Sequence, residues 1–118
     1  MRLNGKVALI TGGGTGIGEA TAKIFAAEGA QVAITGRSAA HLSAAVTKIE
    51  AAGPGAVETL QADVRRYDEV KGAIAATVAR FGGLDVLINN AGVGVFTDVA
   101  SMTPEQWAEV IDTNLTGV

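Results

Sequence analysis

The sequence predicts an α/β domain in which helices cover both faces of a parallel β-sheet. Short apolar runs alternate with segments of helical periodicity along the 118 residues. Most of these runs are continuously apolar at the centre, which is typical of parallel strands buried on both faces. The segments between them are long enough for right-handed helical crossovers, so we expect strands and helices to alternate throughout.

Four runs are predicted to be strands. They are KVALI at 6–10, AQVAIT at 30–35, VETLQA at 57–62 and LDVLI at 84–88. VETLQA alternates apolar and polar residues, so we expect it to be a half-exposed strand at an edge of the sheet.

The first two helices are predicted between these strands. The first has an apolar stripe at helical spacing, formed by Ile17, Thr21, Ile24 and Ala27. Gly29 is its expected C-terminal stop. The second should begin after Ser38 as N-cap and end before Gly53. Its apolar face comprises Leu42, Ala45, Val46 and Ile49.

The third and fourth helices follow the same logic. The third has Val70, Ile74, Val78 and Phe81 at helical spacing, before Gly82. The fourth opens with Thr103-Pro104-Glu105-Gln106, where Thr as N-cap, Pro at N1 and Gln at N3 form a capping-box arrangement. It continues through Trp107 and Leu115 to Val118 without a C-cap signal, so we expect the chain to stop inside this helix.

Composition describes residues 1–118 as one soluble globular domain, with a net charge of −3 and 48% hydrophobic residues. The absence of a Lys/Arg cluster argues against nucleic-acid and anionic-lipid partners. No apolar run suits a signal peptide or a membrane span, so a cytoplasmic location is expected. With no cysteine and His41 as the only histidine, we expect no metal site.

The strongest chemical signal is TGGGTGIG at 11–18, where the first strand gives way to the first helix. Glycines allow a tight turn and close approach of the backbone to a bulky anion, and the N–H groups and dipole of a helix N-terminus favour phosphate. No Lys-Ser/Thr pair follows the last glycine, so this is not a P-loop. The spacing is T-G-x-x-x-G-x-G, with Gly12, Gly16 and Gly18 at the defining places.

Three further motifs accompany the glycine loop. Asp63-Val64 follows the third strand, NNAG at 89–92 closes the fourth, and NLTG at 114–117 lies in the last helix. Together, and in this order, the four motifs resemble the short-chain dehydrogenase/reductase family over about residues 4–118, which is about the first half of a family member. The resemblance implies a truncated Rossmann-type doubly wound sheet of strand order 3-2-1-4 with flanking helices. It also implies hydride transfer between a nicotinamide and a carbonyl or alcohol, such as a 3-oxoacyl thioester, a secondary alcohol or a sugar.

The resemblance assigns roles to individual residues. The loop that wraps the cofactor pyrophosphate comprises Gly12, Thr15, Gly16 and Ile17, and the position of close helix packing is Gly18. The residues that border the adenine are Asp63 and Val64. The segment beside the cofactor ribose comprises Asn89, Ala91 and Gly92. The family's second asparagine, here Asn90, is largely structural. Asn114 matches the helix asparagine of the catalytic tetrad, whose backbone carbonyl holds a water. The residues alone leave plainer roles open: Asp63 as a turn residue, Asn89 as a strand-pairing residue and Asn114 as a solvated one.

Cofactor choice is predicted from the end of the second strand. An acidic residue there accepts the ribose hydroxyls of NAD, but this position is Gly36 and is followed by Arg37. A guanidinium can hold a 2′-phosphate bidentately, so NADP(H) is favoured and NAD(H) is the alternative. The plainer reading of Arg37 is an ordinary solvated cation.

Tyr67 and Lys71 spell the Y-x-x-x-K pattern that carries proton transfer in the family. In the family this pair follows NNAG on a later helix, whereas here it precedes NNAG and follows the adenine-side Asp63-Val64. We therefore interpret the match as coincidence, with Tyr67 on the buried stripe of its helix beside Val70 and Lys71 at the border.

Asn114 is then the only tetrad member expected in the chain, because the serine, tyrosine and lysine would lie beyond Val118. We predict that the 118 residues alone are inactive. The alternative is a non-catalytic nucleotide-binding or interaction module. The face of Trp107 belongs to a helix that commonly lines a subunit interface in the family, so a homo-oligomer is expected.

Overall fold

The computed structural model describes all residues, 1–118. Its elements in chain order are β1 (Val7–Thr11), α1 (Gly16–Ala27), β2 (Gln31–Gly36), α2 (Ala39–Glu50), β3 (Val57–Gln61), α3 (Tyr67–Phe81), β4 (Val86–Ile88) and α4 (Pro104–Ile111). A 3-10 turn at Val99–Ser101 precedes α4, and a π-helical turn at Asp112–Thr116 follows it.

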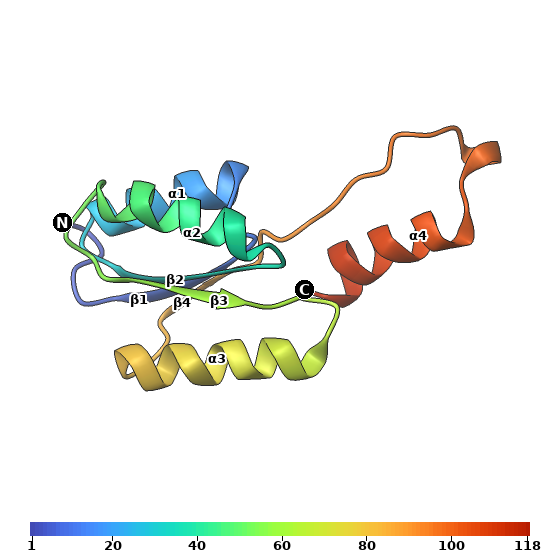
Figure 1. Cartoon of the computed structure of the whole chain (residues 1–118). Helices are drawn as coiled ribbons and strands as arrows, with labels where there is room; N and C mark the ends of the chain where they lie inside the picture. Colours follow the sequence, from blue (N-terminus) through green and yellow to red (C-terminus); the bar gives the residue numbers. More distant parts are fainter.

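The strands form one parallel sheet of order β3-β2-β1-β4, which confirms the predicted fold class and strand order. Residues at equal heights pair across the sheet, for example Thr11 with Thr35 and Leu9 with Leu87. Helices α1 and α2 cover one face, and α3 covers the other (Figure 1). VETLQA is an edge strand, as its alternation predicts, and β4 forms the opposite edge.

The main core lies between β1, β2 and the helices α1 and α2. Its members are Ile10, Ala22, Ala26, Ala30, Val32, Ile34, Leu42, Ala45 and Ile49. The α2 face is therefore the predicted one, since Leu42, Ala45 and Ile49 are buried.

The predicted face of α1 is wrong. Ile17 is 78% and Ile24 60% exposed, whereas the buried residues of the helix are Gly18, Ala22 and Ala26. An added Cβ at Gly18 would meet the Gly12 carbonyl oxygen, so this end of α1 lies too close to the glycine loop for a larger residue. Small side chains therefore face the sheet. The two isoleucines lie one or two positions along the helix from these residues, so they are on its exposed side.

Helix ends follow the predicted local chemistry. Gly29 has a φ of 90°, and the amides of Gly29 and Ala30 donate to the Ala26 and Phe25 carbonyls, as in a Schellman motif. The Ser38 hydroxyl accepts from the His41 amide at 3.2 Å. The capping box at the start of α4 is complete, since Thr103 and Gln106 each accept from the backbone of the other.

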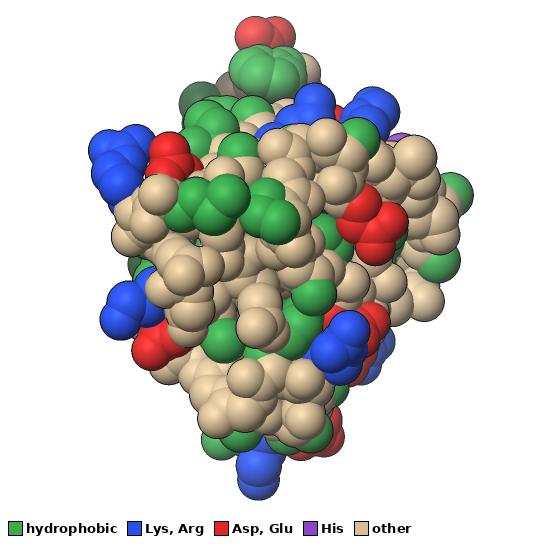
Figure 2. Space-filling view, turned by 90° about the vertical axis from the view of Figure 1, so that its left-hand side faces the viewer, with side chains coloured by type: hydrophobic (Ala, Val, Ile, Leu, Met, Phe, Trp, Pro, Cys, Tyr) green, Lys and Arg blue, Asp and Glu red, His purple; other side chains and the backbone are tan.

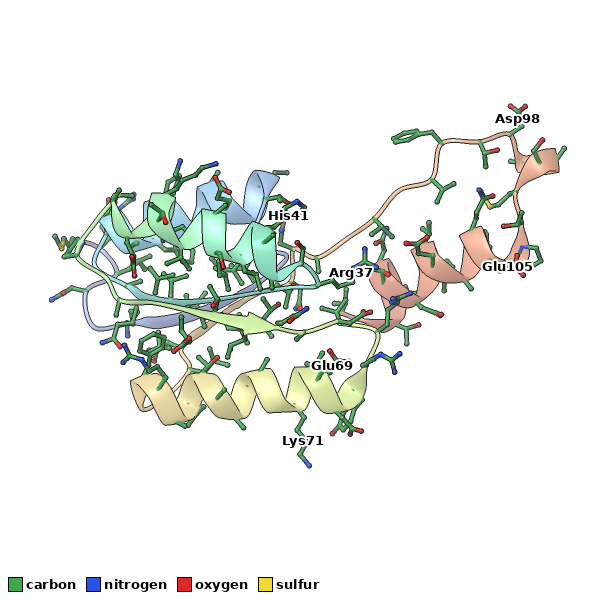
Figure 3. The ribbon with its side chains drawn as sticks, in the orientation of Figure 1. Arg37, His41, Glu69, Lys71, Asp98 and Glu105 are labelled. Carbon is green, nitrogen blue, oxygen red and sulfur yellow. The ribbon has the colours of Figure 1, made fainter.

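The predicted burial of Tyr67 is also wrong. Tyr67 is the first residue of α3 and is 77% exposed, whereas the buried residues of this helix are Ala73 and Thr77. The first turn of α3 leaves the phenol at the rim of the layer, where it is not covered. Lys71 points away from the sheet, toward solvent (Figure 3).

The last quarter of the chain extends from the body. After β4 the backbone runs outward to the 3-10 turn, and α4 returns toward the carboxyl ends of the strands (Figure 1). The molecule measures 50 × 25 × 24 Å, and α4 buries none of its own residues. The predicted continuous helix through Asn114 is interrupted, because residues 112–116 adopt the wider π-helical turn.

The opposite end of the molecule carries mixed charge. Figure 2 shows the face at the amino ends of the strands, where Lys/Arg and Asp/Glu side chains are interspersed among apolar ones. No helix reaches the length and apolarity that crossing a bilayer requires.

Candidate functional site

The carboxyl ends of the strands surround a cavity of about 380 Å³ between the glycine loop, the β2–α2 connection and the segment after β4. Seven of the twelve residues singled out from the sequence line it, namely Gly12, Thr15, Arg37, Asp63, Val64, Ala91 and Gly92. They come from four separate segments of the chain. The remaining lining residues, for which the sequence predicts no cofactor-binding role, are Thr35, Ser38, His41, Ala62, Val93 and Thr113.

The glycine loop is packed tightly against the segment that follows β4. Gly12 has a φ of 65°, and a Cβ on it would lie 2.9 Å from the Ala91 Cα atom. Gly18 lies directly against the Gly12 carbonyl oxygen. A side chain at either place would push the loop away from its neighbours, which explains the need for glycine at both.

The start of α1 presents unused hydrogen-bond donors. The backbone N–H groups of residues 14 to 18 donate to no acceptor in the chain, and the Thr15 hydroxyl makes no capping bond. Gly16 has a φ of 55° and open space around its Cα atom. Free amides at the positive end of a helix dipole suit an anionic group such as a phosphate.

One hydroxyl joins β1 to the segment after β4. The Thr11 Oγ1 atom accepts from the amides of Asn90 and Ala91, both at 3.1 Å. The Asn90 side-chain amide in turn donates to the Gly12 carbonyl at 3.1 Å. Asn90 therefore has the structural role that the family resemblance implies. Thr11 is the first residue of the TGGGTGIG motif, but the spacing of its glycines predicts no role for this hydroxyl.

Asn89 lies outside this cavity. It lines a larger one of about 620 Å³, between the sheet and α3, together with Tyr67, Val70 and Ile74. Of the Y-x-x-x-K pair, only Tyr67 lines this second cavity, on the face of the sheet that α3 covers.

Asn114 is bound to the segment after β4 through its side chain. Its Nδ2 group donates to the Val93 carbonyl, and its Oδ1 atom accepts from the Val93 amide, both at 2.8 Å. The Asn114 side chain thus bonds both backbone groups of Val93, as a neighbouring strand would. Val93 directly follows the cavity residue Gly92. Asn114 is exposed, as the plainer alternative expects, but its side chain also holds Val93 through these two hydrogen bonds.

Asp63 is held by Arg65. The guanidinium binds both carboxylate oxygens at 2.7 to 3.1 Å, and the Arg65 amide donates to Oδ1 at 3.0 Å. The Arg65 side-chain hydrogen bond is the largest cause that lowers the pKa of Asp63 to about 2, so the carboxylate is charged at neutral pH. The plainer turn-forming role of Asp63 is present, and the side chain lines the cavity as well.

Arg37 is partly exposed and reaches across to α4. Its Nη1 atom lies 4.0 Å from the Glu109 Oε1 atom, and its carbonyl accepts from the Gln61 side chain at 2.9 Å. Arg37 lines the 380 Å³ cavity and a neighbouring one of about 390 Å³ that also contains Asp63 and Arg66. Figure 3 shows Arg37 extending from the end of β2 toward α4.

Comparison with known proteins supports the motif-based interpretation. The family model described as short chain dehydrogenase matches residues 6–118. A hydroxy-oxo-hexahydroindene-carboxyl-CoA reductase of Mycobacterium tuberculosis is 45% identical over 117 residues, which cover 98% of this chain and 45% of that protein. The 3-oxoacyl-acyl-carrier-protein reductase FabG of Thermotoga maritima is 42% identical and is matched over 100% of this chain and 48% of its own length.

Solved structures agree. The crystal structure of levodione reductase superposes with a TM-score of 0.93 at 38% identity, covering 98% of this chain and 46% of that one. The chain spans about half the length of the curated relatives it matches. The match of sequence and structure over nearly all residues leads to one conclusion: the chain belongs to the short-chain dehydrogenase family.

Proposed function

We propose that residues 1–118 form the NADP(H)-binding part of an oxidoreductase that transfers hydride between a nicotinamide and a carbonyl or alcohol substrate. The observation that carries this proposal is the row of free amides at residues 14 to 18, beside a cavity lined by residues from four segments. Relatives whose names describe reductases and dehydrogenases support the reaction class.

The donor set fits a dinucleotide. The free amides after Gly12 would hold its pyrophosphate, Asp63 and Val64 would border the adenine, and Ala91 and Gly92 would lie beside a ribose. The nicotinamide, when bound, supplies the hydride chemistry, and the residues of this chain bind and orient it. For Asn114 the structure supports a positioning role, because its side chain holds Val93 next to Gly92.

The pyrophosphate role can be tested with a matched pair of variants. Gly16 has a left-handed φ that Asn and Asp tolerate, and no atom crowds it. Gly16→Asp places a carboxylate among the free amides, whereas Gly16→Asn adds a side chain of the same size without charge. We expect Gly16→Asp to weaken NADPH binding at least about tenfold relative to Gly16→Asn, measured by calorimetric titration. Similar affinities of the two variants would contradict the proposal.

NADP(H) preference rests on Arg37. It is the only lysine or arginine that lines the 380 Å³ cavity, and a guanidinium can bind a phosphate monoester through two hydrogen bonds. Arg37→Asp should weaken NADPH binding much more than NADH binding. Equal losses of affinity for NADPH and NADH would show that Arg37 does not bind the 2′-phosphate.

We expect no hydride transfer by the 118 residues alone. Tyr67 is on α3, on the opposite face of the sheet from α1, and its hydroxyl forms no hydrogen bond with the Lys71 side chain. These 118 residues contain no other tyrosine that could exchange the proton. Cofactor-dependent turnover with any carbonyl substrate would overturn this expectation.

A second candidate function is an interaction module. Phe96, Val99 and Trp107, in and before α4, are all largely exposed. Exposed apolar side chains of this size favour a protein interface, and a second copy of the chain is the partner we propose. Sedimentation of the wild type and of Trp107→Glu tests this. Oligomers that persist in the variant would argue against an interface at this helix.

A further inference from the structure

The C-terminal end of α4 faces the body with charged side chains. No residue of α4 is buried. Glu109 lies 4.0 Å from Arg37, at the end of β2. Glu109 and the C-cap residue Asp112 also help to raise the pKa of Arg65, after the larger effects of Asp63. Two acidic residues of the extension therefore face two basic residues of the strand ends.

Arg37 thus serves two neighbours at once. It lines the cavity proposed for the cofactor, next to the adenine-side Asp63 and Val64, and it pairs with Glu109, which does not line that cavity. The Arg37 side chain is 48% and that of Glu109 42% exposed, so this pair is open to solvent and can be exchanged for another. Asp63 adds a second carboxylate nearby, since Arg37 contributes to lowering its pKa.

We propose that Glu109 is a specificity-determining residue that competes with the 2′-phosphate for Arg37 and so limits the preference for NADP(H) over NAD(H). This inference rests on the proposed function. A phosphate monoester carries close to two negative charges at neutral pH and is repelled by a carboxylate that shares its guanidinium partner. The 2′-hydroxyl of NAD(H) is neutral, so Glu109 hardly affects its binding.

The effect is modest because the pair is exposed. Removing one partner of an exposed charge pair should change the affinity for a competing phosphate by only about 1.5- to 5-fold. Salt screens such pairs, with a Debye length of about 10 Å at 0.1 M and about 3 Å at 1 M. The discrimination by Glu109 should therefore be largest at low ionic strength and nearly vanish at high ionic strength.

The test uses ligands that carry only the adenosine end. Adenosine 2′,5′-bisphosphate and AMP are titrated calorimetrically into the whole chain, as wild type, Glu109→Gln and Glu105→Gln. Glu105 is the matched control, since it lies in the first turn of the same helix, far from Arg37 (Figure 3). Circular dichroism establishes that all three proteins have the same fold.

We expect Glu109→Gln to tighten bisphosphate binding about 2- to 5-fold at low salt and to leave the affinity for AMP unchanged. Glu105→Gln should leave the affinity for both ligands at the wild-type value. An equal gain for both ligands, or no gain for the bisphosphate, would overturn the role of Glu109 while leaving the proposed function intact. A wild type that binds neither ligand would instead overturn the proposed function, and this inference with it.

Discussion

Replacing Thr11 with valine tests the connection between β1 and the segment after β4. The Thr11 hydroxyl is the only acceptor for the amides of Asn90 and Ala91, each at 3.1 Å, and it donates to the Ile88 carbonyl at 3.4 Å. Valine has nearly the same shape but cannot accept a hydrogen bond. The substitution therefore leaves two part-buried amides without a partner.

The expected loss can be worked out from these contacts. An unsatisfied buried donor costs about 1–3 kcal/mol, and both amides are only part-buried, so Thr11→Val should lower the free energy of unfolding by about 2–4 kcal/mol. Thr35 provides the control. It is the register partner of Thr11 on β2 and is buried as well, but its hydroxyl forms no hydrogen bond. Thr35→Val should change the free energy by no more than about 0.5 kcal/mol.

Urea unfolding followed by circular dichroism measures both variants. Trp107 fluorescence is a poor reporter, because this side chain is already exposed in the folded protein. The Thr11 variant should also bind NADPH more weakly, since Ala91 lines the cavity. If Thr11→Val and Thr35→Val unfold with free energies within about 0.5 kcal/mol of each other, the hydroxyl does not hold the two segments together.

Three further outcomes are expected. Arg65 lowers the pKa of Asp63 to about 2, so the ion pair stabilises the fold fully above about pH 4 and ceases to do so as the pH falls toward 2. In acid unfolding curves, the free energy of unfolding of the wild type should therefore fall by about 1 kcal/mol more than that of Asp63→Asn over this range. Asn114→Ala removes both hydrogen bonds to Val93 and should speed amide hydrogen exchange at Val93 at least about tenfold, and unchanged exchange would refute that pairing. Tyr67→Phe should leave stability and NADPH affinity unchanged, because the phenol is exposed, and a lost affinity would place Tyr67 in the site.

Local chemistry explains which parts of the fold could be predicted. Gly29, Ser38 and Thr103 act on backbone groups within a few residues of themselves. The end of α1 and the starts of α2 and α4 can therefore be predicted from local sequence, without knowledge of the tertiary contacts. The apolar runs and the lengths between them similarly indicate parallel strands with crossover helices. The glycine spacing at 11–18 is also a local signal, since a positive φ at Gly12 and Gly16 is a property of the backbone itself.

Which side of a helix is buried could not be predicted in the same way. In α1 the larger side chains Ile17 and Ile24 suggest a core stripe, yet the close approach of the helix admits only the small residues Gly18, Ala22 and Ala26. Tyr67 fits the periodicity of α3, but the helix starts at the rim of the sheet, where nothing covers it. Burial depends on the distance between layers, and periodicity does not contain that distance.

The sequence by itself determined the order of the elements, their caps and the motifs that the family shares. Only the tertiary structure decided which of those residues meet: the Thr11 hydroxyl with two amides after β4, Asn114 with Val93, and Arg37 with Glu109. Each pair joins segments more than twenty residues apart in the chain or in different layers. Such contacts arise from the parallel packing of the strands, which brings their carboxyl ends together at one edge of the sheet.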